Sequence, residues 1–198
     1  MPRPSSFTVD EMRDRALRVF WRRGYGATSM GDLVSMAGLN RQAIYASFGG
    51  KRDLYLSCFE RYQDTIVTPA FAPVEGPGRG LDAIRAYFAY QIDAADRLDL
   101  RGYGCFVANA TAEIAPHDAA VRAHVAQHRA RLTGGFAGAL RQAAGSGPAG
   151  EAASVAPLAE TLFVFATGLW TVARVESDGD RLRSSVGALL DMVEGRLS

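Results

Sequence analysis

The sequence has 198 residues, of which 48% are hydrophobic and 22% charged, and its formal net charge is +1. This composition is that of one or two small globular domains, and it excludes a large multidomain machine and a disordered chain. The charge is uneven, because residues 1–60 hold nine Lys and Arg against six Asp and Glu, whereas the remaining residues hold 13 against 15. The basic first third predicts that this part of the chain meets an anionic partner.

The sequence gives no sign of membrane insertion or secretion. The longest charge-free apolar run lies between Glu160 and Arg174 and has 13 residues, whereas about 20 are needed to span a bilayer. The first residues lack the apolar stretch of a signal peptide, and two cysteines are too few for a disulfide scaffold. We therefore expect a cytoplasmic protein with no membrane partner.

Helical periodicity appears almost everywhere, and no strand-like alternation stands out. The stretch 68–80 holds three prolines and three glycines and is predicted to be a loop, and 145–150 is predicted to be a flexible linker. In chain order, the predicted helices cover residues 9–23, 30–36, 40–48, 51–66, 81–95, 103–115, 121–140, 155–176 and 182–197. The fold class is therefore all-α, with a three-helix domain at residues 1–50 and a larger helical domain at 51–198.

Residues 28–54 have the pattern of a helix-turn-helix, in which two short helices are joined by a turn. Thr28 or Ser29 would cap the first helix, and Asn40 the second. Gly38 suits the tight turn because it has no Cβ to clash. The side chains that would pack the two helices together are Leu33, Ala37, Leu39 and Ile44.

The second short helix would present Asn40, Arg41, Gln42 and Ala46 outward. Arg suits guanine and Gln suits adenine in the major groove, and Tyr45 and Ser47 can hydrogen-bond phosphates. Lys51 opens the next helix, so its ammonium and the helix N-terminus would jointly hold a phosphate. The alternative is a helical hairpin that only fills a core.

Residues 9–60 resemble the DNA-binding domain of the tetracycline-repressor (TetR) family of transcriptional regulators. Val34 departs from the pattern, because the family often carries a small Ala at this helix crossing. The resemblance implies a nine-helix homodimer in which helices 1–3 bind DNA, helix 4 connects, and helices 5–9 form the ligand-binding and dimerisation domain. The features that match are Gly24-Tyr25, Thr28-Ser29, Ala37-Gly38-Leu39, Ile44-Tyr45, Phe48, Lys51 and Leu54.

By the same resemblance, Tyr45 and Lys51 match phosphate-contacting positions, and Arg41 and Gln42 match positions that read bases or backbone. Arg3, in the tail before the first helix, would add a groove or phosphate contact. The residues expected to contact DNA are thus Thr28, Ser29, Asn40, Arg41, Gln42, Tyr45, Ser47 and Lys51.

The segment 101–118 resembles a recurrent pattern of one subgroup of the family, with Gly104-Cys105, Asn109 and Glu113. On a helix, Cys105, Asn109 and Glu113 share one face, and a few polar groups among aromatic rings are what a small-molecule pocket needs. The alternative is that Asn109 and Glu113 only tie helices together and that the rings are plain core. The residues expected to line a pocket are Tyr87, Phe88, Cys105, Phe106, Asn109, Glu113, Phe136, Phe163 and Trp170.

The last two helices carry more apolar surface than a thin bundle can bury alone, so we expect them to pair with a second chain. In such a dimer, two recognition helices about 34–36 Å apart reach successive major grooves of a palindrome. The alternative is an internal core without a dimer. The expected interface residues are Leu162, Phe165, Ala166, Leu169, Val186, Leu189, Leu190 and Val193.

Signals for other chemistry are weak. His124 and His128 stand at i, i+4, a spacing that can bind zinc, but no metalloprotease pattern surrounds them. Cys58 and Cys105 could sense oxidants, although free cysteines are usually buried small hydrophobes. We therefore expect no catalytic residues, no metal and no cofactor.

Together these patterns predict a DNA-binding transcriptional regulator, not an enzyme. The favoured form is a homodimeric repressor that binds a palindromic operator in double-stranded DNA and is released by a small-molecule effector in the C-terminal domain. One alternative is an ungated DNA-binding dimer. The other is a helical small-molecule-binding protein or enzyme with a purely structural N-terminal bundle. The sequence does not separate repression from activation.

Overall fold

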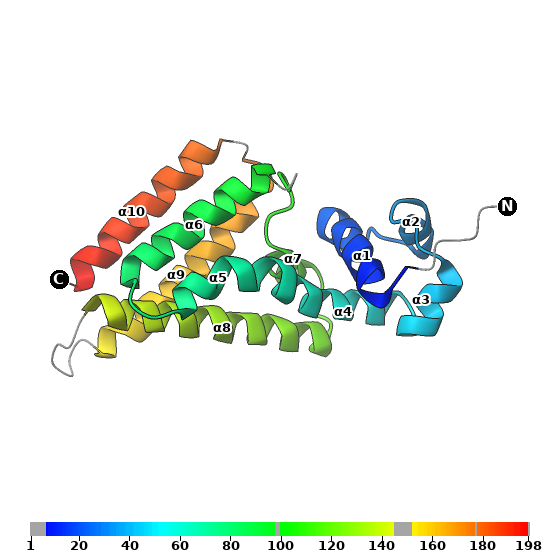
Figure 1. Cartoon of the computed structure of the whole chain (residues 1–198), viewed down its shortest axis with the longest axis horizontal. Coiled ribbons are helices and arrows are strands. Elements are labelled where there is room, and N and C mark those ends of the chain that lie inside the picture. The colour runs from blue at the N-terminus through cyan, green and yellow to red at the C-terminus, as the bar shows by residue number, and fades with distance from the viewer. Residues whose placement is uncertain (1–6, 98–99, 145–151, 177, 198) are drawn as a thin grey trace.

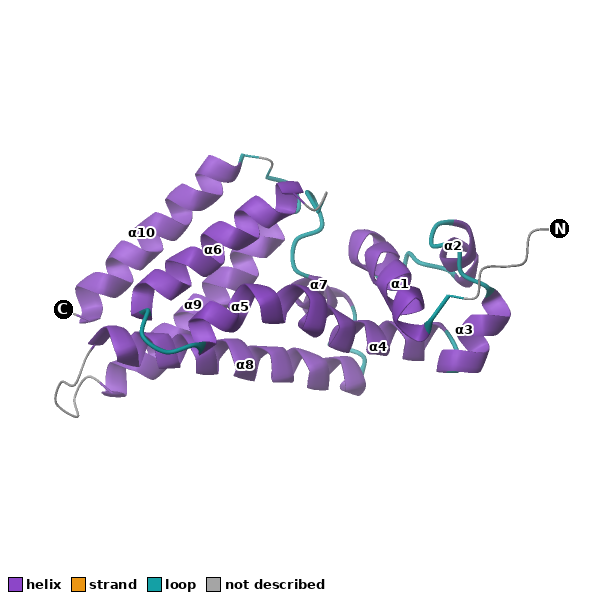
Figure 2. Cartoon of the chain, viewed as in Figure 1, coloured by secondary structure: helices purple, strands orange, loops and turns teal. Residues whose placement is uncertain are grey.

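The computed structural model describes residues 7–97, 100–144, 152–176 and 178–197, and every regular element in these residues is helical (Figures 1 and 2). Arg3 and the predicted linker 145–150 lie outside the described residues. In chain order the elements are α1 (Val9–Arg23), α2 (Met30–Ser35), α3 (Arg41–Phe48), α4 (Lys51–Tyr62), a π-helical turn (Gln63–Val67), α5 (Thr68–Glu75), α6 (Gly80–Arg97), α7 (Phe106–Glu113), α8 (Ala119–Ala144), α9 (Ala152–Val172) and α10 (Gly179–Leu197).

The first three helices lie together at one end of the molecule, and their ends are set by local capping (Figure 1). Thr8 and Glu11 form a capping box at the start of α1, and Gly24, with φ of 86°, ends that helix. Ser29 caps α2, and the Asn40 side chain accepts hydrogen bonds from two backbone N–H groups at the start of α3. The predicted bounds of this domain's helices are therefore confirmed to within one residue.

The chain then runs through α4, the π-helical turn and α5 as one continuous rod, so the predicted loop over 68–80 is wrong for most of its length. A proline is tolerated in the first turn of a helix, and Pro69 stands there. The backbone N–H of Thr68 bonds to the carbonyl of Gln63, which is the wide hydrogen bond of a π-turn. Counted with this rod as one, the described residues contain nine helical segments, the number expected.

The remaining helices form a bundle around that rod. Figure 1 shows α6 and α10 side by side with α8 crossing beneath, and α8 packs against both α6 and α9. The centre of the bundle is aromatic, since Phe71, Phe88 and Phe136 are fully buried and their rings contact one another. This packing forms the aromatic part of one hydrophobic core that continues into the first helices of the chain.

One helix is apolar for most of its length. The window Val155–Val172 of α9 has a mean hydropathy of 1.5 over 18 residues, which is long and apolar enough to cross a membrane by length and composition alone. This is weak evidence for a span, because core helices of globular proteins have the same property. Only 28% of that window is buried within the single chain.

Candidate nucleic-acid interface and ligand pocket

The outward face of α3 carries the polar side chains that the sequence singles out. Ile44 is fully buried and anchors the helix, whereas Arg41, Gln42, Tyr45 and Ser47 are exposed. Tyr45 stands four residues after Arg41 and three after Gln42, so both of these side chains neighbour it on the helix surface. Exposure leaves these side chains available to a duplex, and their contacts with DNA stay predictions.

The turn between α2 and α3 is fixed against α1, which sets the position of the recognition helix. Gly38 has φ of 66°, a value that residues with a Cβ rarely adopt. The guanidinium of Arg15 on α1 donates a hydrogen bond of 3.1 Å to the carbonyl of Ala37. The two short helices are thus held as one unit with α1.

The prediction that Thr28 contacts DNA is wrong. Its side chain is fully buried, and its hydroxyl donates a hydrogen bond of 2.6 Å to the carbonyl of Gly24. The neighbouring Ser29 is exposed, but its hydroxyl is engaged with Asp32 in the cap of α2. Both residues build the turn before α2, which is why a helix-turn-helix has hydroxyl side chains at this point.

Lys51 also faces inward, against the expectation of an ammonium presented to a phosphate. Its Nζ donates hydrogen bonds to the carbonyls of Tyr25 and Thr28 at 2.8 and 2.7 Å, and it lies 4.0 Å from the centre of the Tyr25 ring. Burial lowers the pKa of the ammonium, and the nearby carboxylates of Glu113 and Asp32 oppose that shift. Two of the three N–H groups of the ammonium therefore donate to the turn 25–28.

The same turn is held from its other side by the C-terminal domain. The carboxylate of Glu113, the last residue of α7, accepts hydrogen bonds from the backbone N–H groups of Tyr25 and Gly26 at 3.0 and 2.7 Å. Asn109, one turn earlier, donates to the carbonyl of Tyr103 at 2.9 Å and lies 3.5 Å from that of Trp21. Neither residue lines either of the two cavities described below.

These hydrogen bonds favour the alternative that Asn109 and Glu113 tie helices together over the prediction that they bind a ligand. The physical reason is the placement of α7 beside the C-terminal end of α1, so that their common face meets α1 rather than the centre of the bundle. These contacts join residues more than 80 positions apart in the sequence. They form a direct connection between the two halves of the chain.

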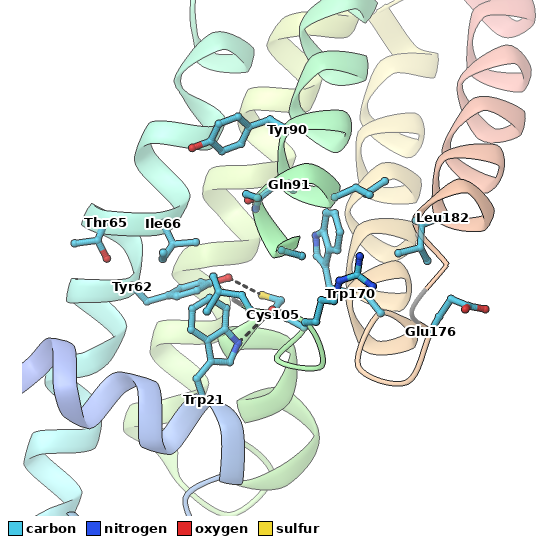
Figure 3. A pocket seen from close by; sticks show the side chains of 18 residues that line it. Trp21, Tyr62, Thr65, Ile66, Tyr90, Gln91, Cys105, Trp170, Glu176 and Leu182 are labelled. Carbon is cyan, nitrogen blue, oxygen red and sulfur yellow. Dashed lines mark hydrogen bonds between the residues drawn. The ribbon is translucent and has the colours of Figure 1, made fainter. Parts of the chain in front are cut away.

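A pocket of about 90 Å³ opens where the two halves meet (Figure 3). Trp21 from α1 and Tyr62 from α4 form one side, and Trp170 from α9 forms another. The hydroxyl of Tyr62 donates to Sγ of Cys105 at 3.4 Å, and Nε1 of Trp21 donates to the carbonyl of Gly104 at 3.2 Å. The full lining consists of Trp21, Tyr62, Thr65, Ile66, Tyr90, Gln91, Ile92, Ala94, Ala95, Leu100, Arg101, Gly104, Cys105, Trp170, Ala173, Glu176, Gly179 and Leu182.

Of the predicted pocket residues, Cys105 and Trp170 line this pocket. Tyr87 and Phe163 line a smaller adjoining cavity of about 20 Å³. Phe88, Phe106 and Phe136 line neither cavity, because they are at most 1% exposed and pack into the core, so their assignment to the pocket is wrong.

Sequence reasoning missed Trp21, Tyr62 and Gln91 as pocket residues. Trp21 lies on a helix assigned to DNA binding, and no periodicity shows that its ring faces the other domain. Tyr62 follows Leu54 and Cys58 at intervals of four residues, a pattern typical of the core-facing side of a helix. Gln91 lies on α6, and only the packing of α6 within the bundle places it beside Trp21 and Tyr62.

The two cysteines and the histidine pair have structural surroundings. Burial raises the pKa of both thiols, Cys58 and Cys105, so they stay protonated. His124 stacks on the ring of Phe59, and Nδ1 of His128 is hydrogen-bonded to the Gln63 amide at 2.9 Å. Among the residues that the structure describes, no group of three or more His, Cys, Asp or Glu side chains lies close enough to hold a metal ion.

Seven of the eight predicted dimer-interface residues are buried inside the single chain, so their assignment to an intermolecular contact is wrong, whereas that of Phe165 stays a prediction. They pack against α6 and α8, which cover that side of α9 and α10. Only Phe165 is half-buried. The residues that are at most 7% exposed are Leu162, Ala166, Leu169, Val186, Leu189, Leu190 and Val193. The opposite faces expose Val164 and Val172 on α9 and Met192 on α10.

Comparisons with known proteins identify an N-terminal and a C-terminal domain in this chain. The family model for the N-terminal domain, bacterial regulatory proteins of the tetR family, matches residues 13–58, and the model for the tetracyclin repressor-like C-terminal domain matches residues 80–189. The transcriptional regulator YezE of Bacillus subtilis (strain 168) is 31% identical over 98% of this chain and 100% of its own. The repressor ComR of Escherichia coli (strain K12) is 31% identical over 58% of this chain and 54% of its own.

Solved structures show the same fold. A cysteine mutant of the TetR-family regulator CifR, complexed with 26-bp operator DNA, aligns with a TM-score of 0.79 at 22% identity over 96% of this chain and 98% of CifR. A regulatory protein from Rhodobacter sphaeroides aligns with a TM-score of 0.80 at 20% identity over 94% of this chain and 98% of its own. From the domain matches and the full-length relative, the chain belongs to the TetR family of DNA-binding transcriptional regulators.

Proposed function

We propose that the protein is a homodimeric repressor that binds a palindromic operator and leaves it when a small molecule occupies the pocket. It acts in the bacterial cytoplasm without catalysis or a cofactor. The observation that carries the proposal is the exposed polar face of α3, where Arg41, Gln42 and Tyr45 project from a helix anchored by buried Ile44. Arg and Gln side chains on such a helix suit base edges in the major groove.

The dimer in this proposal forms through the outward faces of α9 and α10. Val164 is 61% exposed and Met192 65% exposed, on helices whose other sides are already packed. Gly168 and Ala188 also face outward, and small residues allow a partner helix to come close. A second copy would cover the part of α9 that the single chain leaves open, and it would place a second recognition helix for the other half of a palindrome.

Ligand control in this proposal uses the contacts between the two halves. The ligand shifts the protein away from its DNA-binding form only if it binds the other form more tightly. Because the pocket wall includes Trp21 of α1, occupation changes the surroundings of the DNA-binding half directly.

The test is selection of binding sites from a random duplex library with the full-length protein. The control is the double variant Arg41→Ala and Gln42→Ala, whose side chains are exposed and whose loss leaves the core intact. We expect a palindromic consensus with the wild type and none with the variant. No enrichment with the wild type, or equal enrichment with the variant, contradicts the DNA-binding part of the proposal.

Two further measurements test the finer parts. Sedimentation analysis should give a dimer, and Val164→Glu should convert it to a monomer. A reporter gene placed behind the selected site should be repressed by the protein. A monomeric wild type or an activated reporter would contradict the corresponding part.

A further inference from the structure

The pocket is lined by both halves of the chain. Trp21 lies on α1, next to the helix-turn-helix, whereas Gln91, Cys105 and Trp170 come from the C-terminal helices and the loop before α7. Figure 3 shows Trp21 and Tyr62 below the space and Trp170 to its side. A molecule in this pocket therefore touches the DNA-binding half and the C-terminal half at once.

The lining favours a planar, uncharged ligand. Four aromatic rings contribute to it, from Trp21, Tyr62, Tyr90 and Trp170. Aromatic rings attract one another in edge-to-face or offset geometry beyond the burial of their area. Trp21 already makes such edge contacts with Tyr62 at 5.0 Å between ring centres. An aromatic ligand would extend this cluster.

The charged groups of the lining give no buried partner for an ion. Among the described lining residues the charged side chains are Arg101 and Glu176. Arg101 is exposed, and the Glu176 carboxylate accepts hydrogen bonds from the backbone N–H of Asp178 and, at 3.5 Å, from the Arg181 guanidinium. A buried ion needs a dedicated partner, so a neutral ligand is favoured. The half-buried Gln91 side chain already hydrogen-bonds Tyr87, and its amide has a second N–H that can donate to one oxygen of that ligand.

The volume limits the ligand to about one ring. An engineered cavity of about 150 Å³ binds benzene. This pocket is smaller, about 90 Å³, but it is partly open to solvent, so it would take a single ring only with part of that ring in the opening. We propose that the pocket binds a small uncharged aromatic molecule, of about one ring with one hydrogen-bonding oxygen, in direct contact with Trp21. The ligand then bridges α1 and the C-terminal helices. This inference rests on the proposed function for its regulatory meaning, but the binding itself can be tested separately.

The sequence supplies a specific reporter, because the chain has two tryptophans and both line the pocket. The probes are phenol, cyclohexanol, benzoate and benzylammonium, which separate aromaticity from charge at nearly constant size. With the full-length protein, phenol should change tryptophan fluorescence saturably and raise the midpoint of thermal unfolding. Cyclohexanol should bind about tenfold more weakly, the equivalent of about 1.4 kcal/mol. Benzoate and benzylammonium should give no saturable signal.

Equal affinity for phenol and cyclohexanol would overturn the aromatic part of the proposal, and tighter binding of either ion would overturn the uncharged part. No effect of phenol on either fluorescence or thermal stability would overturn the proposal as a whole. The thermal measurement uses the unaltered protein, so this outcome does not depend on any variant folding.

Contact with Trp21 is tested with two single-tryptophan variants, Trp170→Phe and Trp21→Phe. In Trp170→Phe the remaining emission comes from Trp21 on α1, and phenol should still change it saturably. If phenol alters the emission of Trp21→Phe but leaves that of Trp170→Phe unchanged, the ligand lies only against the C-terminal half and the bridging proposal fails. Trp170→Tyr replaces Trp170→Phe if the latter unfolds.

Failure of this inference is distinguishable from failure of the proposed function. A protein that selects a palindromic duplex but shows no response to phenol keeps the DNA-binding proposal and loses the ligand class. A protein that binds phenol but enriches no duplex keeps the ligand class and loses the DNA-binding proposal.

Discussion

The hydrogen bonds from the turn 25–28 to Glu113 make a prediction that separates a connecting role from a ligand-binding one. Glu113→Gln keeps the size of the side chain but replaces one acceptor oxygen by an NH₂ group. Because both partners, Tyr25 and Gly26, offer N–H donors, the amide can accept from one of them and must turn a donor toward the other. One of the two bonds is lost, and the charge that strengthens both is removed.

The expected cost follows from the geometry. A hydrogen bond to a charged group contributes about 1.5–3 kcal/mol, but Glu113 is exposed, so solvent screening reduces this to about 1 kcal/mol for each bond. Glu113→Gln should therefore lower the free energy of unfolding by about 1 kcal/mol. For a chain of this length that is a fall of about 2–4 °C in the unfolding midpoint.

The assay is amide hydrogen exchange read at Tyr25 and Gly26, together with thermal unfolding. Both amides should exchange faster in Glu113→Gln, while the amides in the middle of α8 keep their protection. Glu60→Gln, an exposed glutamate on α4, is the matched control and should leave Tyr25 and Gly26 unchanged. If exchange at these two amides is the same in Glu113→Gln and wild type, the carboxylate does not hold the turn and the connecting role is refuted.

Three further predictions follow from single side chains. Lys51→Met should destabilise the protein by about 1 kcal/mol or more, because it removes the donor to two carbonyls, yet leave the salt dependence of operator binding unchanged; a salt slope reduced by about one would reveal a phosphate contact. Gln42→Ala should relax base preference at one operator position by about 1–3 kcal/mol, measured by repeating the duplex selection, and an unchanged consensus would count against base readout. Burial, with a smaller effect of Arg131, lowers the pKa of His128 to about 4, so the unfolded chain binds more protons and stability should rise between about pH 4 and pH 6.5 by at most about 3 kcal/mol. Denaturant unfolding across this pH range should show that the free energy of unfolding depends less on pH in His128→Gln than in the exposed control His117→Gln. An equal pH dependence in the two variants would exclude His128 as its source.

The N-terminal domain could be predicted from the sequence because its signals are local. Gly24 ends α1, Asn40 caps α3, and Gly38 takes the positive φ that the turn requires. Each of these features acts within a few residues, so the pattern of the chain is enough to find it. A local signal misled the prediction only beyond this domain, at Pro69, whose presence indicates a loop although a proline in a first helical turn fits within a continuous rod.

The pocket could not be predicted with the same success because it depends on which helices meet. Aromatic residues such as Phe88 and Phe136 look like pocket walls in the sequence, but they lie in the fully packed centre of the bundle. Trp21 looks like part of a small DNA-binding core and instead meets the C-terminal half. A period of 3.6 residues shows which face of a helix is apolar, but not which partner covers it.

Because periodicity does not show which partner covers an apolar face, the interface residues predicted on α9 and α10 were the ones that pack inside the chain. Leu162 and Leu190 lie on the apolar stripes that the sequence shows, and these stripes are satisfied by α6 and α8 of the same chain. The faces left for a second copy carry a mixed set, including Val164, Gly168 and Met192. A mixed face of small and apolar residues has a weaker periodic signal than a core stripe. A prediction from periodicity therefore selects the core stripe as the interface.

Besides Trp21, the short helix α7 is a second physical connection between the pocket and the DNA-binding half. Its N-cap, Cys105, lines the pocket, and its last residue, Glu113, holds the turn 25–28. Eight residues of helix span about 12 Å, so about two helical turns join the pocket to the turn 25–28. If a ligand regulates the protein as proposed, a shift of Gly104 and Cys105 would be carried through α7 and would move the Glu113 carboxylate away from the N–H groups of Tyr25 and Gly26. Coupling between two sites is typically about 1–3 kcal/mol, or about 5–150-fold in affinity, and Glu113→Gln should reduce the effect of a bound ligand on operator binding as well as the stability of the turn.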